Sequence, residues 1–223
     1  MTCAPFSALS AVVLDFDGTI VDSNTLKRAG FFAVAATFGL TEKAVQSALE
    51  RGGDRYAIAA HMFGENARAS QFCAAYKTHC EAGILRTART PGFSEFLDAI
   101  RQNRVPVFIV SATPHDDLLG TVSLLGLSDA FDGVYGGHGR KRDNLRRICE
   151  DRRISPCDVI VVGDNIEDLE AARDEGCPFV AMEAWKADAM KYSAPPTGRV
   201  ADFYELADLL RHVGLLNARP ETV

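Results

Sequence analysis

The chain has 223 residues, of which 47% are hydrophobic and 24% are charged, and its formal net charge is -6. This composition is ordinary for a globular protein, and the length suits one large domain or a core with a smaller inserted domain. The acidic balance argues against nonspecific nucleic-acid binding, and no apolar stretch approaches the length of a membrane span, so we predict neither nucleic acid nor membrane as a partner.

The first predicted element is a buried strand at residues 11–16. Its sequence, AVVLDF, is apolar without interruption until Asp15, and the motif DFDGT then places Asp17 two residues further on. Continuous apolarity is typical of a strand that is covered on both faces, as in a parallel sheet. Packing does not require two carboxylates at the end of such a strand, so they indicate chemistry.

The interval after this strand contains no convincing strand pattern. It predicts helices only, at residues 22–38, 41–50, 54–63 and 65–86. A crossover between parallel strands needs one helix, so several helices in succession predict an inserted subdomain. We therefore expect an α-helical cap at residues 21–87 and a catalytic core formed by residues 1–20 and 88–223.

The rest of the chain alternates between helical and strand patterns. Helices are predicted at residues 91–103, 116–127, 143–152, 165–176 and 202–214. Strands are predicted from apolar runs at residues 105–111, 133–137, 158–164 and 178–182. This alternation is typical of an α/β fold, and it predicts a doubly wound, Rossmann-like parallel sheet.

Three of the predicted strands end in polar side chains. Asp15 and Asp17 end the first strand, and Ser111 ends the strand at 105–111. Asp164 ends the strand at 158–164, and Asp168 follows it by one helical turn. In open α/β sheets, ligands bind beyond the carboxyl ends of the strands, so we expect these side chains to converge on one crevice.

Each of these residues also has a purely structural interpretation. The Asp17-Gly18 pair suits a turn, and Ser111 suits a helix N-cap. Asp168 suits the first turn of a helix, where a carboxylate interacts well with the helix dipole. These interpretations explain each residue separately, but they do not explain why three strands end alike.

The predicted crevice would hold four carboxylates, and these repel one another. Two unit charges about 4 Å apart interact by about 4 kcal/mol at an effective dielectric constant of about 20. A cation is therefore required, and hard oxygen ligands favour Mg²⁺, which shares its coordination shell with substrate phosphate. A serine hydroxyl and a lysine would then be positioned for the remaining phosphate oxygens.

The motifs together resemble the haloacid dehalogenase superfamily. They are DFDGT at 15–19, a serine after a strand at 111, a lysine upstream of a GDxxxD motif, and GDNIED at 163–168. The helical insertion directly after DFDGT resembles the branch that contains phosphoglycolate phosphatase and β-phosphoglucomutase. The resemblance extends over essentially the whole chain.

This resemblance implies a role for each matched carboxylate. Asp15 would be the nucleophile that forms an aspartyl-phosphate, and Asp17 would be the general acid and then the general base. Asp15, the backbone carbonyl of Asp17, and Asp164 would hold Mg²⁺, with support from Asp168. An aspartate two residues after the nucleophile also favours phosphate esters over other substrates of the superfamily.

The resemblance also implies the groups that bind the phosphoryl group. Ser111, Ala112 and Thr19 would contact it, and a lysine would balance its charge. Lys141 is the predicted lysine, but the family pattern places a proline after this residue and the segment GRKRDNL has none. Arg140 and Arg142 therefore remain alternatives to Lys141.

The helical insertion is expected to close over the site, exclude water and recognise the leaving group. Its most suggestive segment is RGGDRY at 51–56. The two glycines would let the backbone approach a ligand, and Arg55 would bind a second anionic group. The alternative is a flexible turn with a solvated arginine.

The leading hypothesis is a Mg²⁺-dependent phosphatase that acts on a small phosphorylated metabolite, of the phosphoglycolate or sugar phosphate type. One alternative is a phosphomutase of the β-phosphoglucomutase type, which uses the same aspartates. Another is a non-catalytic protein that binds a phosphometabolite. The presence of Asp17 argues against the last, because a binding protein does not need an acid and base.

The six cysteines are scattered without the spacing of a zinc site, so we expect reduced thiols. The N-terminus lacks the pattern of a signal peptide. These features predict a cytoplasmic protein, either a monomer or a homodimer.

Overall fold

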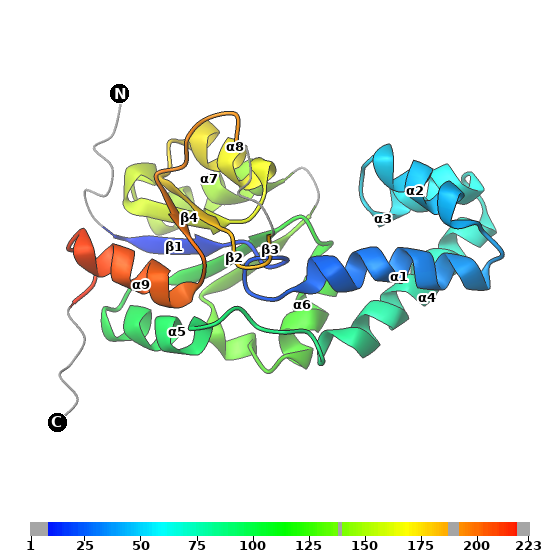
Figure 1. The fold of residues 1–223 in the computed structure, drawn as a ribbon. Helices are drawn as coiled ribbons and strands as arrows, with labels where there is room; N and C mark the ends of the chain where they lie inside the picture. Colours follow the sequence, from blue (N-terminus) through cyan, green and yellow to red (C-terminus); the bar gives the residue numbers. More distant parts are fainter. Residues whose placement is uncertain (1–8, 138–139, 187–191, 218–223) are drawn as a thin grey trace. The chain divides into compact units, whose positions relative to one another are not determined.

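The computed structural model describes residues 9–137, 140–186 and 192–217 (Figure 1), and the chain divides into two compact units. The core unit consists of Met1–Asp22 and Ala88–Val223, and the helical unit consists of Ser23–Thr87. Each unit has its own cluster of buried hydrophobic side chains.

The described part of the core unit contains a six-stranded sheet in the order β3-β2-β1-β4-β5-β6. Its strands are β1 (Ala11–Leu14), β2 (Val107–Ser111), β3 (Gly133–Gly136), β4 (Val159–Gly163), β5 (Phe179–Met182) and β6 (Gly198–Val200). Neighbouring strands are parallel, and Val13 of β1 pairs with Phe108 on one side and Val161 on the other. Because the strand order runs outward from β1 in both directions, the sheet is doubly wound, which confirms the predicted fold class.

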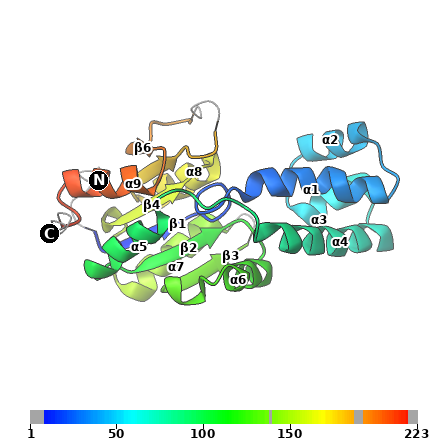
Figure 2. The same ribbon diagram turned by 60° about the horizontal axis from the view of Figure 1, so that its bottom comes forward.

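Helices cover both faces of this sheet (Figures 1 and 2). They are α5 (Phe93–Gln102), α6 (His115–Leu124), α7 (Lys141–Arg152), α8 (Ile166–Glu175) and α9 (Phe203–His212). On one face, Leu145 of α7 and Leu169 of α8 pack in the same cluster as Val13 of β1. On the other face, Phe203 of α9 packs against Phe93 of α5, with ring centroids 5.1 Å apart. Burial from both sides explains the continuous apolar runs of the strands.

A strand that was not predicted and an earlier helix start are the main differences between the core unit and its predicted elements. The strand β6 was not predicted, because Gly198–Val200 is a three-residue segment without an apolar run, and its pairing with Val180 of β5 gives it extended structure. Helix α7 begins at Lys141, two residues before the predicted start. This earlier start places Lys141 on the first turn of the helix.

The helical unit consists of α1 (Ser23–Thr37), α2 (Glu42–Glu50), α3 (Arg55–Phe63) and α4 (Ala67–Ile84). The side chains of Asp54 and Asn66 cap α3 and α4 by accepting hydrogen bonds from backbone N–H groups of the first turns. Helices α1 and α4 pack closely at Gly83, where a Cβ atom would lie 2.4 Å from the Leu26 side chain. The unit is held together by aromatic contacts such as Phe31 against Tyr76, with ring centroids 4.3 Å apart.

The two ends of the core unit that lead to the helical unit lie side by side. The N–H of Asp22 donates to the carbonyl of Ala88 at 3.0 Å, and Val21 forms an antiparallel bridge with Arg89. This pairing brings residues before and after the helical insertion together at the edge of the core.

The cysteines do not fully match the expectation of reduced thiols. Four of them are free thiols in the structure, namely Cys73, Cys80, Cys149 and Cys177. Cys157 is disulfide-bonded, so the expectation is wrong for this residue, and the scattered spacing of the cysteines offered no signal for it.

Among the described residues, no helix combines the length and the apolarity that a membrane span requires.

Candidate active site

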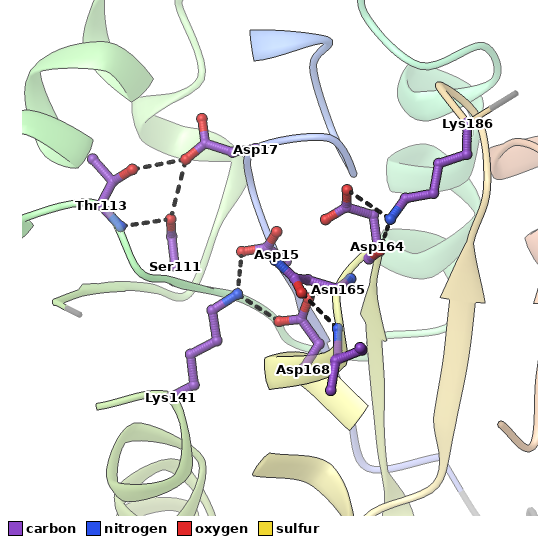
Figure 3. A network of polar contacts seen from close by, with 10 residues as sticks. Asp15, Asp17, Ser111, Thr113, Lys141, Asp164, Asn165, Asp168 and Lys186 are labelled. Atoms are coloured by element: carbon purple, nitrogen blue, oxygen red, sulfur yellow. Dashed lines mark hydrogen bonds and ion pairs between the residues drawn. The ribbon is translucent and has the colours of Figure 1, made fainter. Parts of the chain in front are cut away.

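The site lies at the carboxyl ends of three neighbouring strands (Figure 3). Asp15 directly follows β1, Ser111 is the last residue of β2, and Asp164 directly follows β4. Because β1 pairs with both β2 and β4 in parallel, these three ends meet at one edge of the sheet. The predicted convergence of strand ends is therefore a direct consequence of the strand order.

Lys141 links two carboxylates in the centre of the site. Its Nζ atom lies 2.8 Å from Oδ1 of Asp15 and 2.6 Å from Oδ1 of Asp168, and all three side chains are buried. Arg140 is exposed, and so is Arg142, which pairs with Asp143 and Glu175. Of the three basic residues that the sequence left open, Lys141 is the one whose side chain reaches Asp15.

Asp168 has two roles at the start of α8. Its Oδ1 atom accepts the Lys141 ammonium, while its Oδ2 atom accepts a hydrogen bond from the N–H of Asn165 at 3.1 Å. The second contact is half of a capping box with the Asn165 side chain. The structural interpretation of Asp168, as a carboxylate at the start of a helix, is therefore confirmed, and its support of a metal ion stays a prediction. Gly163 makes room for it, since a Cβ atom there would lie 2.4 Å from the Asp168 carboxyl.

Three buried carboxylates form a cluster that can hold a metal ion. Oxygen atoms of Asp15, Asp164 and Asp168 all lie within 4.8 Å of one another. The ammonium groups of Lys141 and Lys186 contact these carboxylates but do not balance three such charges, and hard carboxylate oxygens are the ligands that Mg²⁺ prefers. The cluster therefore fits a divalent cation. The Asp17 side chain is not part of it.

Burial dominates the electrostatics of the cluster. It raises the pKa of Asp15 to about 7, and the charge of Asp168 adds to the effect while Lys141 opposes it. Burial likewise raises the pKa of Asp164 to about 6, with a further contribution from Asp15. Burial alone would lower the pKa of Lys141, but the two carboxylates that it contacts raise it above its ordinary value.

These shifts predict a pH-dependent effect of Mg²⁺ on stability. Asp15 and Asp164 have raised folded pKa values, so between about pH 4 and about pH 7 the metal-free folded protein binds more protons than the unfolded chain. Its unfolding free energy should therefore decrease as the pH rises from about 4 to about 7. Lys141 stays protonated throughout this pH range, so its contribution to the unfolding free energy does not change with pH. Because Mg²⁺ competes with these protons for the carboxylates, the increase in Tm that Mg²⁺ causes should be larger at pH 7.5 than at pH 5.

The measurement is thermal unfolding with Mg²⁺ and with EDTA at both pH values. Asp129→Asn is a suitable control, because Asp129 lies in the 3-10 turn Ser128–Ala130 and outside the cluster. It should leave the Mg²⁺ effect unchanged, whereas Asp164→Asn should remove most of it. An equal Tm increase at both pH values would place the cation away from these carboxylates.

Asp17 occupies a different environment from the cluster. The hydroxyl of Thr113 donates to its Oδ2 atom at 2.7 Å, and the hydroxyl of Ser111 lies 3.5 Å from the same oxygen. The N–H of Thr113 donates to the Ser111 hydroxyl at 3.1 Å. Gly18, at φ 80°, turns the chain directly after Asp17. The two aspartates of the first motif are therefore held by different partners, an ammonium for Asp15 and hydroxyls for Asp17.

Three further residues were predicted to contact the substrate, namely Thr19, Ala112 and Arg55. The Thr19 side chain is fully buried, and its hydroxyl has no hydrogen-bond partner among the described residues. Ala112 lies between Ser111 and Thr113 and is half-buried. Arg55 belongs to the helical unit, where it begins α3 and its guanidinium lies 5.1 Å from the centre of the Tyr56 ring. Its role in binding stays a prediction.

Two residues of the site were missed by the sequence interpretation. Thr113 lies two positions after the predicted serine, and a second hydroxyl in VSATP was a signal that could have been used. Lys186 follows β5, where its Nζ atom contacts the backbone carbonyl of Asp164 and lies 3.5 Å from its Oδ2 atom. The strand β5 ends without a recognisable motif, so Lys186 offered no signal.

The loop that carries Lys186 is anchored to the core. The indole N–H of Trp185 donates to the hydroxyl of Thr90 at 3.0 Å, and this hydroxyl donates to the backbone carbonyl of Thr19 at 2.7 Å. Thr90 is buried, so the contact is shielded from water. Trp185 and Thr90 thereby hold the loop beside the turn that follows Asp17.

Comparisons with known proteins agree with this architecture. The family model of haloacid dehalogenase-like hydrolases matches residues 12–182. Phosphoglycolate phosphatase from Chromobacterium violaceum is 26% identical over 216 residues, which cover 89% of this chain and 96% of that protein.

Solved structures show the same fold. The crystal structure of a predicted phosphoglycolate phosphatase from Haemophilus somnus has a TM-score of 0.73 at 16% identity and covers 92% of this chain and 99% of that one. The HAD hydrolase YfnB from Bacillus subtilis, solved with bound magnesium, has a TM-score of 0.72 at 14% identity, with coverage of 92% and 99%. At these identities the likeness concerns the fold alone.

Proposed function

The chain belongs to the family of haloacid dehalogenase-like hydrolases, and from this premise we propose that it is a Mg²⁺-dependent phosphatase of small phosphorylated metabolites. The observation that carries the proposal is the separation of the two aspartates of DFDGT. Asp15 lies in a buried carboxylate cluster beside Lys141, whereas Asp17 lies outside that cluster beside two hydroxyls. One site thus offers a nucleophile, Asp15, beside the Lys141 ammonium, and a separate acid, Asp17.

In this proposal Asp15 attacks phosphorus, so that a bond from its carboxylate oxygen to phosphorus forms while the ester P–O bond breaks. Asp17 gives a proton to the leaving oxygen. It then takes a proton from the water that hydrolyses the aspartyl-phosphate, which releases phosphate and restores Asp15. Lys141 holds Oδ1 of Asp15 and so orients the nucleophile while it offsets the charge of the incoming phosphate.

Mg²⁺ would be held by Asp15, Asp164 and the backbone carbonyl of Asp17. When bound, it supplies neutralisation of charge on the phosphoryl oxygens. Asp168 supports this arrangement through the Lys141 ammonium and the start of α8. Ser111 is positioned to donate to the phosphoryl group from the end of β2. The similarity to phosphoglycolate phosphatases over most of the chain supports a small phosphorylated acid or sugar as the substrate class.

The test is phosphate release from a panel of phosphorylated acids and sugars, measured with Mg²⁺ and with EDTA. We expect release that requires Mg²⁺ and is concentrated on a few related esters. If instead a sugar phosphate is isomerised with little release of phosphate and only with a bisphosphate primer, the protein is a mutase. If a folded, Mg²⁺-binding protein transforms no ester at all, the proposal is wrong and a binding function takes its place.

Arg55 is proposed to bind a second anionic group of the substrate. Arg55→Ala should raise KM about tenfold for a substrate with such a group, such as phosphoglycolate, and leave kcat nearly unchanged. p-Nitrophenyl phosphate, which lacks a second anion, should show no change in KM. Arg51→Ala provides a matched control, because Arg51 is an exposed arginine at the end of α2. An equal rise in KM for both substrates would assign Arg55 to the fold of the helical unit, and no rise for either would exclude it from substrate binding.

A further inference from the structure

We propose that Thr113 is a positioning residue for Asp17, and that it turns one particular oxygen of this carboxyl toward the leaving group. The inference rests on the proposed function, in which Asp17 is the general acid. A carboxyl group that rotates freely presents either oxygen in many directions. A strong hydrogen bond to one oxygen removes this freedom and leaves the other with a defined direction.

The geometry assigns this task to Thr113 and not to Ser111. Thr113 Oγ1 lies 2.7 Å from Oδ2 of Asp17, which is typical of a good O–H···O hydrogen bond, whereas Ser111 Oγ lies at 3.5 Å, at the limit of such a contact. Figure 3 shows both hydroxyls on the same side of the Asp17 carboxyl. Both contacts reach Oδ2, so the two hydroxyls fix the position of this oxygen of the acid.

Thr113 also orients the residue that would bind the phosphoryl group. Its backbone N–H donates to Ser111 Oγ at 3.1 Å. A single residue therefore holds the acid with its side chain and the phosphate-binding hydroxyl with its backbone. The relative placement of these two groups matters, because the acid must reach the oxygen that leaves the bound phosphorus.

The backbone of Thr113 is itself held in place. A Cβ atom at Gly136 would lie 2.5 Å from the Thr113 carbonyl oxygen, so the end of β3 packs directly against this loop. The N–H of Gly137 donates to the Ser111 carbonyl at 3.0 Å, and Pro114 precedes the first residue of α6. A threonine on a mobile loop would restrict Asp17 little, whereas one clamped between β3 and α6 can fix it.

The consequence for the reaction depends on the leaving group. As the bond from Asp15 to phosphorus forms and the ester P–O bond breaks, the leaving oxygen takes the proton from the Asp17 carboxyl. An alkoxide needs this proton, because it is a poor leaving group without it. p-Nitrophenolate is stable as an anion and needs it much less. Misorientation of Asp17 should therefore affect alkyl phosphates and spare p-nitrophenyl phosphate.

The experiment compares Thr113→Val, Thr113→Ser and the control Thr121→Val on both kinds of ester. Thr121 is a half-buried threonine of α6 whose hydroxyl donates to the Asp117 carbonyl, away from the site. Thr113→Val should lower kcat for 2-phosphoglycolate by about tenfold to a hundredfold, and kcat for p-nitrophenyl phosphate by less than about threefold. Thr113→Ser, which keeps the hydroxyl, should restore both to within about threefold, and Thr121→Val should change neither.

Equal losses on the two esters would overturn the inference and assign Thr113 to phosphate binding or to the fold. Failure of Thr113→Ser to restore the alkyl phosphate reaction would also overturn it. If Thr113→Val does not fold, as judged by thermal unfolding, Thr113→Ala takes its place with the same expected pattern. Absence of Mg²⁺-dependent release from both esters by the wild-type protein overturns the proposed function, and the inference with it.

Discussion

Asp15→Asn is expected to abolish phosphate release, with a loss of roughly 10⁴-fold or more in kcat. The amide has nearly the shape of the carboxylate but cannot act as a nucleophile toward phosphorus. The folded structure should be preserved, because Lys141 retains its contact with Asp168 at 2.6 Å when the charge of Asp15 is removed. The measurements are steady-state phosphate release and thermal unfolding of the same preparation.

A matched comparison is Asp17→Asn, which removes the proposed acid and leaves the nucleophile. This variant should lose turnover of alkyl phosphates, yet after rapid mixing with p-nitrophenyl phosphate it should still gain the mass of one phosphoryl group. Asp15→Asn should show no such gain in mass. Substantial residual turnover by Asp15→Asn would remove Asp15 from the role of nucleophile, even if the protein proved to be a phosphatase by another route.

Lys141→Met is expected to have the largest effect on stability. The substitution leaves the buried carboxylates of Asp15 and Asp168 without the ammonium that joins them. Loss of one partner of a buried ion pair typically lowers the unfolding free energy by about 3–5 kcal/mol. We expect a loss of this size in EDTA at pH 7.5, together with at least a hundredfold lower kcat.

The pH dependence of this loss gives a further check. Burial already raises the pKa of Asp15 to about 7, and removal of Lys141 raises it further, so at pH 5 the carboxyls of the variant carry protons. The difference in Tm between Lys141→Met and the wild type should therefore be smaller at pH 5 than at pH 7.5.

The control for Lys141→Met is Arg142→Met, which changes the adjacent cation on the same helix. The Arg142 side chain is 52% exposed, so its loss should change the unfolding free energy by no more than about 0.5 kcal/mol. Comparable losses of Tm in the two variants would indicate that Lys141 contributes only as part of the first turn of α7. A large loss confined to Lys141→Met would identify the buried ion pair as its source.

The choice of Lys141 over its neighbours illustrates what local sequence leaves open. Three consecutive basic residues stand at 140–142, and none is marked by the family's proline. Successive side chains of an α-helix point about 100° apart, so at most one of them can face the site once α7 begins there. The start of α7 decides which one it is, and this start depends on the packing of Leu145 and Ile148 against the sheet.

The sequence by itself determined the α/β fold, the helical insertion and the three strand ends that carry Asp15, Ser111 and Asp164. Buried parallel strands require continuous apolar runs, and polar residues that interrupt such runs are visible without any structure. Strand β6 escaped this reasoning because a three-residue edge strand needs no apolar run.

Only the tertiary structure decided which side chains meet across the site. Lys141 and Asp15 are 126 residues apart in the chain, Thr113 and Asp17 are 96 apart, and Lys186 and Asp164 are 22 apart. Contacts of this kind depend on where each helix begins and on which direction each loop leaves the sheet. Those directions are set by packing between elements, and no local pattern of residues specifies them.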